Sequence, residues 1–464
     1  MKYPFAKLFL CTILVFVTAH GYESHDQPIQ HAPADKTFTK KRCTVLVYAT
    51  SRNSLSSFLD RNLQQLMQVG TNDNINIVVH LDLYGSWFCK LTQRFILYKD
   101  RMVQVGPDME LDSGDPKTFH DACHWAFTNF PADMNILVLW NHGSGDLEPS
   151  FSRIIDPSVF YVRNPKTNLL ELDRSLHFLE YLETAAKKGA FADKERGICF
   201  DDCTNHYLTN HQVGVVLRDI QHTCLGGKPL DVLYCDACLM MGIGFAYSLK
   251  PYRTPSPVRY VVASQEVTLA YGFDYAKMFT KIAEQPMTAQ EFVNHAVQVF
   301  ADYYKNIAYD YTQSALCMEK LDTLYERVDA LGNTLIEGLT KQQNRSVKKC
   351  ILQCSASNQC MSFEEPSYKD LYHFCSNMLN SLDMMTLHTP AETAAYQQRL
   401  RLSLQNCCNA LEYVVCAHSS SESLKNAHGL SIYIAYDKIY PTFPTTDFAL
   451  HTSWLKMLAL LVNS

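Results

Sequence analysis

The stretch LDVLYCDACLMMG at residues 230–242 decides the fold. Its first half is a short apolar run of strand-forming residues, which is typical of a central parallel strand covered on both faces. An apolar run typical of a helix follows, so the stretch predicts a buried strand that leads into a helix. Cys238 falls at the junction. Ligands of open α/β sheets bind at the carboxyl ends of the strands, and the positive end of a following helix favours a thiolate there.

A second stretch has the same form. In NILVLWNHGSGD at 135–146, His142 follows an apolar run and precedes a glycine-rich turn. Parallel strands of one sheet deliver their C-terminal residues to the same edge, so we expect His142 near Cys238. Buried structural cysteines are common, and that remains the alternative for Cys238 alone. The pairing with a histidine favours an activated nucleophile instead.

Composition narrows the class of protein. The chain has 464 residues, 47% of them apolar and 19% charged, so it is globular and long enough for two or three domains. The net charge of −6 is small for this length and no long basic run occurs, which argues against nucleic acid as a partner. Strands at 43–50, 75–83 and 258–266 alternate with helical patterns, which predicts a mostly parallel sheet with helices on both faces.

The N-terminus predicts export. In residues 1–20, Lys2 and Lys7 precede a short apolar run that ends in small residues, as in a secretory signal peptide. An uncleaved anchor is the alternative, but the run is shorter than a membrane span needs. Residues 21–41 are polar and predict a flexible leader or pro-segment. We therefore expect a secreted protein, or one of the periplasm or cell envelope, with no stable membrane insertion after signal cleavage.

The remaining chain predicts three further features. Prolines and basic residues concentrate between 147 and 196, which is typical of a long functional or mobile connection. Residues 301–464 are expected to be largely helical, with a long helical pattern from about Gln313 to Leu339 and a late strand at 429–435 that returns to the core sheet. The many cysteines of an exported chain favour some disulfides, although their spacing does not predict zinc binding.

Taken together, these stretches resemble the clostripain family of cysteine peptidases, which share the caspase, gingipain and legumain fold. The likeness runs from about residue 43 to 464 and is carried in order by TVLVYAT, LDSGDPKTF, ILVLWNHGSG, GICFDD, DVLYCDACLM, VVASQE and GLSIYI. It implies a caspase-like α/β/α sandwich with a mostly parallel central sheet and a largely helical C-terminal region. The catalytic domain would span 42–300, with 147–196 as its processing loop.

The resemblance also implies residue roles. Cys238 matches the family's nucleophile and His142 its general base and acid, in a dyad that needs no third carboxylate. The backbone N–H groups of Gly143 and Cys238 would face the developing oxyanion. Asp236 matches an acid that receives a basic P1 side chain, and Glu266 is expected as a second acid in that pocket. The alternatives are a helix-capping carboxylate for Asp236 and a solvated loop acid for Glu266.

The expected function is a secreted cysteine endopeptidase that cuts protein or peptide substrates after Arg or Lys. It would process itself within 147–196, where the candidate sites are Lys187, Lys188, Lys194 and Arg196. The chemistry needs no cofactor and no metal site is expected. Some similar enzymes need Ca²⁺, for which Asp201 and Asp202 are candidate ligands, but solvated turn acids are the simpler interpretation and no calcium-loop motif is present. The alternative is a non-catalytic secreted relative that acts as a binding or effector protein.

Two residues depart from the family pattern. Asp146 follows HGSG, where relatives often have an aromatic residue, and it is expected to alter the rim of the pocket. Cys235 lies close in sequence to Cys238 and is expected to compete as a thiol or to form a disulfide. Neither departure removes a member of the dyad.

Overall fold

The computed structural model describes residues 30–32, 38–84, 90–147, 161–173, 197–340 and 345–463. The predicted signal peptide, most of the predicted leader and all four candidate processing residues (Lys187, Lys188, Lys194 and Arg196) lie outside these ranges.

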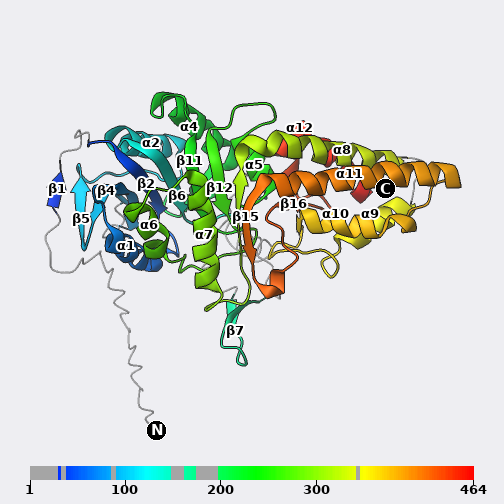
Figure 1. Cartoon of the computed structure of the whole chain (residues 1–464), viewed down its shortest axis with the longest axis horizontal. Coiled ribbons are helices and arrows are strands. Elements are labelled where there is room, and N and C mark those ends of the chain that lie inside the picture. The colour runs from blue at the N-terminus through cyan, green and yellow to red at the C-terminus, as the bar shows by residue number, and fades with distance from the viewer. Residues whose placement is uncertain are drawn as a thin grey trace, which may run out of the picture.

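A ten-stranded sheet forms the centre of the described part of the chain (Figure 1). The five central strands, from β3 to β12, run parallel, and hairpin-like antiparallel pairs flank them. This arrangement confirms the predicted fold class. In spatial order the strands are β1 (Gln30–Ala32), β5 (Arg101–Val105), β4 (Lys90–Tyr98), β3 (Ile75–Tyr84), β2 (Lys41–Thr50), β6 (Ala132–Trp140), β11 (Leu230–Asp236), β12 (Val258–Ala263), β13 (Thr312–Cys317) and β15 (Val415–Ser420).

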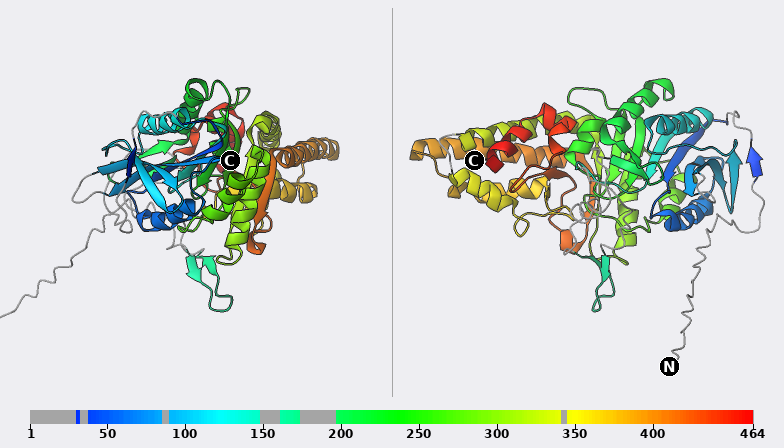
Figure 2. Two further views of the ribbon diagram at one scale, coloured as in Figure 1. Left: turned by 60° about the vertical axis from the view of Figure 1, so that its left-hand side comes forward. Right: turned by 180° about the vertical axis from the view of Figure 1, so that it is seen from behind.

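Helices cover both faces of this sheet (Figure 2). One face carries α1 (Ser56–Val69), α6 (Tyr275–Glu284) and α7 (Ala289–Tyr304), which pack in that order. The other face carries α2 (Pro116–Asn129), α4 (Asn210–Thr223) and α5 (Ile243–Leu249). Because both faces are covered, the central strands are buried almost throughout, which explains their continuous apolar runs.

The C-terminal helices pack on one another and extend away from the sheet, toward the right of Figure 1. The short helix α12 (Asp447–His451) packs on α5 and ties this region back to the sheet. The helices of the extension are α8 (Leu321–Thr340), α9 (Arg345–Ser355), α10 (Leu371–Asn380), α11 (Pro390–Val414) and α13 (Trp454–Asn463).

Two predictions for residues 301–464 are wrong in detail. The segment 312–317 is strand β13 instead of the start of a long helix, and β13 and β15 both join the central sheet, so a boundary at 300 cuts through that sheet. The late strand β16 (Ser431–Tyr433) pairs with β14 (Tyr368–Asp370) in a separate small sheet and does not return to the core sheet. The edge of β13 that it would have joined is already taken by β15.

Two small sheets border the carboxyl edge of the central strands. Strands β9 (Gly197–Asp201) and β10 (His206–Thr209) form one, and β7 (Tyr161–Arg163) and β8 (Leu170–Leu172) form the other. The β7–β8 hairpin is the described part of the predicted processing loop.

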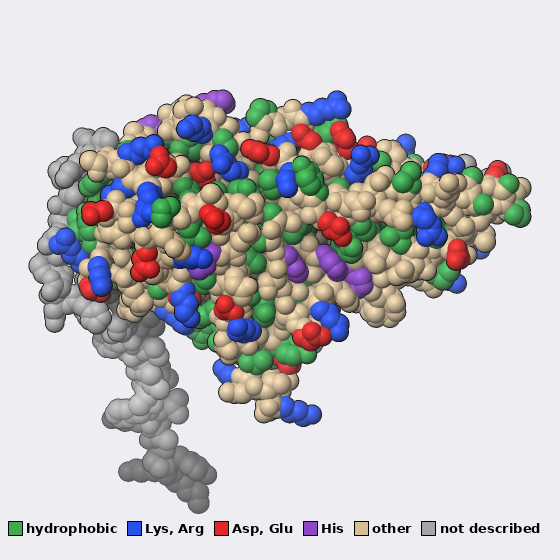
Figure 3. Space-filling view, in the orientation of Figure 1, with side chains coloured by type: hydrophobic (Ala, Val, Ile, Leu, Met, Phe, Trp, Pro, Cys, Tyr) green, Lys and Arg blue, Asp and Glu red, His purple; other side chains and the backbone are tan. Residues whose placement is uncertain are grey.

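Within the described ranges, no helix is both long and apolar enough to cross a membrane. On the face shown in Figure 3, acidic and basic side chains are interspersed, as expected from the small net charge.

Candidate active site

The sheet register brings His142 and Cys238 to the same edge. Strands β6 and β11 are parallel neighbours in which Trp140 lies opposite Asp236. His142 lies two residues after Trp140, and Cys238 lies two residues after Asp236. The Asn141 N–H donates a hydrogen bond of 3.3 Å to the Asp236 carbonyl, so the two segments remain side by side beyond the strands. The structure therefore places the two predicted dyad residues on adjacent strand ends.

The Cys238 thiol is only 3% exposed and contacts Thr268. The Thr268 N–H donates to Sγ at 3.4 Å, and the thiol lies 3.8 Å from the Thr268 carbonyl oxygen. Burial raises the pKa of Cys238 to about 11, although the Thr268 contacts act in the opposite direction. The group is therefore a thiol at neutral pH, and its activation depends on a base.

The expectation that the positive end of the following helix favours the thiolate form of Cys238 is wrong. Helix α5 begins at Ile243, five residues after Cys238. The Asp146 carboxylate accepts hydrogen bonds from the Gly244 and Phe245 N–H groups at 2.9 and 2.6 Å, so it already occupies the positive end of this helix. Asp146 is buried, and it performs the capping role that was the alternative for Asp236. Its departure from the family pattern is thus explained by helix capping.

His142 is held by a residue that the sequence did not single out. Its Nε2 atom lies 3.0 Å from the Ser54 Oγ atom, in the loop between β2 and α1. Ser54 therefore restrains the orientation of the imidazole ring at the end of β6. The only signal for Ser54 was a run of short polar residues after a strand, which predicts helix capping equally well.

Two asparagines fix this loop to the end of β6. The side-chain amides of Asn53 and Asn141 both donate to the carbonyl oxygens of Thr50 and Phe200. Asn141 also accepts a hydrogen bond of 2.8 Å from the Phe200 N–H. Phe200 belongs to β9, so three separate segments form one rigid support for His142.

Glycine at 143 is required by close packing. A Cβ atom there would lie 2.6 Å from the Cys238 carbonyl oxygen and 2.8 Å from the Met240 sulfur, closer than real contacts allow. Among the hydrogen bonds of the described residues, neither the Gly143 nor the Cys238 N–H is a donor. Both N–H groups therefore remain available for the predicted oxyanion role.

Asp236 lies at a small pocket beside Cys238. The pocket is also lined by Trp140, Thr268 and Gly272, and its volume of about 20 Å³ is roughly that of one water molecule. The Tyr275 hydroxyl donates to the Asp236 carboxylate at 2.6 Å. Burial raises the pKa of Asp236 to about 7, and the Tyr275 hydrogen bond opposes this shift. An arginine side chain fits this pocket only after it opens.

Glu266 is not brought to that pocket. Its side chain is fully buried, which contradicts a solvated loop acid, and Oε1 accepts hydrogen bonds from the Val267 and Glu364 N–H groups at 2.8 and 2.9 Å. These contacts tie the loop after β12 to the segment before β14. The bonding favours a structural role for Glu266 over substrate binding.

Asp201 is paired within the protein and is not a solvated turn acid. The Arg52 guanidinium lies between the Asp82 and Asp201 carboxylates, at 2.5 and 2.8 Å, and all three side chains are buried. Burial and the charge of Asp201 raise the pKa of the neighbouring Asp202 to about 7. No group of three His, Cys, Asp or Glu side chains within the described ranges is arranged to hold a metal ion.

The described cysteines are all free thiols, so the expected disulfides are not found among them. Cys235 is buried on β11 next to Asp236. Because side chains alternate along a strand, Cys235 points to the face opposite Asp236, toward Cys199, and does not compete with Cys238 in the pocket.

Comparisons with known proteins agree with this geometry. A sequence profile of the clostripain family matches residues 47–154 and 184–458. Clostripain of Hathewaya histolytica is 24% identical over 264 residues, which are 52% of this chain and 42% of that protein, so the match spans less than half of the relative.

Two solved structures share the fold. An inactive zymogen C11 protease from Parabacteroides distasonis superposes with a TM-score of 0.57 at 16% identity, covering 91% of this chain and 99% of that one. A secreted C11 cysteine protease from Bacteroides thetaiotaomicron gives 0.55 at 13% identity, with 90% and 100% covered. At these identities the likeness establishes the fold.

Proposed function

The chain belongs to the clostripain family of cysteine peptidases, and we propose on this premise that it is an endopeptidase that cuts after Arg or Lys. The observation that carries the proposal is the placement of His142 and Cys238 at adjacent, in-register strand ends, with Asp236 two residues before the nucleophile. A binding protein has no need of this arrangement.

The reaction begins with proton transfer. Because the pKa of Cys238 is raised to about 11, His142 accepts the thiol proton as Sγ attacks the substrate carbonyl. The Gly143 and Cys238 N–H groups stabilise the oxyanion, and such donors contribute about 3 kcal/mol each to the transition state. His142 then gives its proton to the leaving amine. Water hydrolyses the resulting thioester and returns the enzyme to its starting state.

Asp236 supplies the preference for basic residues. Its carboxylate is buried beside a pocket of about 20 Å³, and in such surroundings an ion pair with a guanidinium or ammonium group is strong. A bound cation lowers the pKa of Asp236 and so favours the ionised form. Opening of the pocket must precede binding, since its volume of about 20 Å³ is too small for either side chain.

Self-processing within 147–196 is part of the proposal. The β7–β8 hairpin of this loop packs beside the pocket, because the Tyr161 hydroxyl donates to the Val267 carbonyl at 2.7 Å and Thr268 follows directly. A cut in the loop thus changes the support of the pocket wall. The candidate sites remain Lys187, Lys188, Lys194 and Arg196. Purified wild type that remains one chain, as Cys238→Ala does, would contradict self-processing.

We also propose export through residues 1–20, to the outside of the cell or to the periplasm or envelope. The basic start and short apolar run support it. Mass spectrometry of the mature N-terminus tests this: a start near residue 21 supports export, and retention of the apolar run contradicts it.

Labelling separates an enzyme from a non-catalytic relative. An electrophile on an arginyl peptide should modify Cys238 irreversibly, and an excess of an arginyl substrate should protect it. A folded, processed chain that is not labelled favours the binding or effector alternative.

A further inference from the structure

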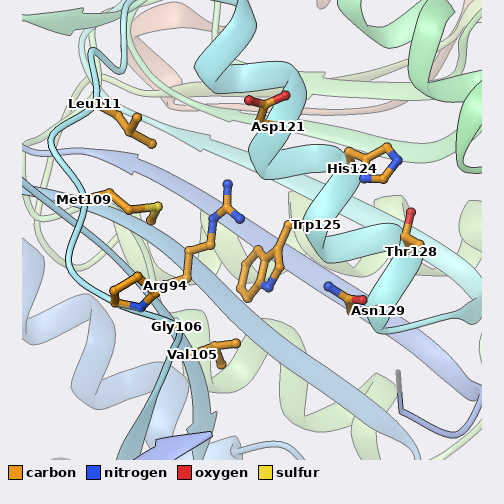
Figure 4. Close-up of a pocket in the computed structure, with 11 residues that line it drawn as sticks. Arg94, Val105, Gly106, Met109, Leu111, Asp121, His124, Trp125, Thr128 and Asn129 are labelled. Atoms are coloured by element: carbon orange, nitrogen blue, oxygen red, sulfur yellow. The ribbon is translucent and has the colours of Figure 1, made fainter. Parts of the chain in front are cut away.

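A second cavity lies between helix α2 and the β4–β5 hairpin, and none of its lining residues takes part in the proposed reaction (Figure 4). Its volume is about 560 Å³, within the usual range of small-ligand sites. Figure 4 shows the Arg94 guanidinium in the middle of the cavity, between Met109 and Leu111 on one side and Asp121 and Trp125 on the other.

Arg94 is a cation without a direct ion-pair partner among the described residues. Its guanidinium lies 5.1 Å from the centre of the Trp125 ring. It forms no ion pair and no hydrogen bond with any described residue. The Nε atom is buried without a partner. Burial lowers the pKa of Arg94, which reflects the cost of holding a charge away from water. A ligand with an anionic group would remove this cost.

The acid beside Arg94 is already engaged. The Asp121 carboxylate accepts hydrogen bonds from Lys117, at 2.5 Å, and from His120, at 3.2 Å. It makes no ion pair with Arg94, although its charge acts on the guanidinium from a greater distance. The cavity therefore presents a guanidinium whose charge Asp121 compensates only in part.

The shape of the site favours a carboxylate over a spherical anion. Trp125 covers one face of the guanidinium, so the edge of the planar fork is left for a planar, bidentate acceptor. Met109 and Leu111 supply apolar walls, and Thr128 and Asn129 supply polar groups at the end of α2. An amide-bearing chain that ends in a carboxylate matches all three features.

We propose that this cavity binds the carboxyl-terminal end of a peptide. The terminal carboxylate pairs with Arg94, the last side chain packs against Trp125 and Met109, and the preceding amide bonds to Thr128 or Asn129. Peptidases release such ends at every turnover, and the site does not depend on Cys238 for binding.

Calorimetric titration of the full chain with N-acetyl-Ala-Phe tests the proposal, because the corresponding C-terminal amide differs only in charge. We expect the acid to bind at least about tenfold more tightly than the amide, since charge-assisted hydrogen bonds are lost in the latter. Arg94→Gln should weaken binding of the acid by a similar factor. Arg101→Gln, an exposed substitution in the same hairpin, should leave it unchanged.

Arg94→Lys keeps the charge but removes the fork, so it should retain intermediate affinity if Arg94→Gln affects folding. Thermal melting identifies which variants are folded. Equal binding of acid and amide, undiminished binding by folded Arg94→Gln, no binding to the wild type, or inorganic phosphate binding as tightly as the acid would each overturn the proposal.

Discussion

The Nε2 atom of His142 lies 3.0 Å from the Oγ atom of Ser54. The dyad is therefore supported by a third side chain from the loop between β2 and α1, and this side chain is a hydroxyl where other enzymes use a carboxylate or an amide. The Asn53 and Asn141 amides hold both partners in place, so the orientation of the imidazole is fixed before substrate arrives.

Removal of this contact should reduce turnover. In Ser54→Ala, the ring can rotate and exchange tautomers, so we expect kcat to fall about tenfold, equivalent to about 1.4 kcal/mol, with KM changed less than twofold. The pH dependence of kcat should shift as well, which a purely structural role would not cause. Ser57→Ala, an exposed change in the same segment, is the control, and Ser54→Thr should retain activity. Unchanged kcat in Ser54→Ala would refute positioning by Ser54.

Asp236 predicts a pH dependence. The pKa of Asp236 is raised to about 7, and only its ionised form attracts a basic side chain, so kcat/KM for arginyl substrates should rise as pH increases through about 7. In Asp236→Asn this rise should vanish and kcat/KM for arginyl substrates should fall at least about a hundredfold. The residual arginyl activity of Asp236→Asn over the same pH range serves as the control. The same rise in both enzymes would assign it to the dyad instead.

Asp146 should matter for stability. Its carboxylate satisfies two N–H groups at the start of α5, so Asp146→Ala leaves them buried without an acceptor. We expect a loss of about 2 kcal/mol in the free energy of unfolding, measured by urea denaturation of the Cys238→Ala background to prevent self-cleavage. The exposed Asp133→Ala should change stability by less than about 0.5 kcal/mol. Equal stability of the two variants would argue against the capping role.

Chelation of divalent cations should leave activity unchanged. The Arg52 guanidinium already pairs with both Asp82 and Asp201, so these carboxylates are engaged without a metal. Rates measured in EDTA and in added Ca²⁺ should agree within twofold. A rate that falls in EDTA and returns with Ca²⁺ would show instead that activity depends on this ion.

Local sequence patterns correctly predicted the strands that carry the two dyad residues. The apolar runs before His142 and Cys238 are long enough to specify buried parallel strands, and parallel strands must bring their ends to one edge. The strands predicted at 43–50, 75–83 and 258–266 follow from equally local signals, and β2, β3 and β12 lie there.

Contacts between segments that are distant in the sequence could not be predicted from local patterns. The pairing of Ser54 with His142, of Tyr275 with Asp236 and of Asp146 with α5 joins residues that are 88, 39 and about 98 positions apart. The hydrogen bond that Glu266 accepts from the Glu364 N–H was hidden for the same reason, because Glu364 lies in another segment. The raised pKa of Cys238 reflects burial, which a motif does not report.

The most direct test of the account is hydrolysis of fluorogenic peptides with Arg, Lys, Asp, Asn or Leu at P1, by wild type and Cys238→Ala side by side. The account predicts cleavage after Arg and Lys that disappears in the variant. Cleavage at another P1 residue would contradict the role of Asp236, and activity that persists in Cys238→Ala would contradict the dyad itself.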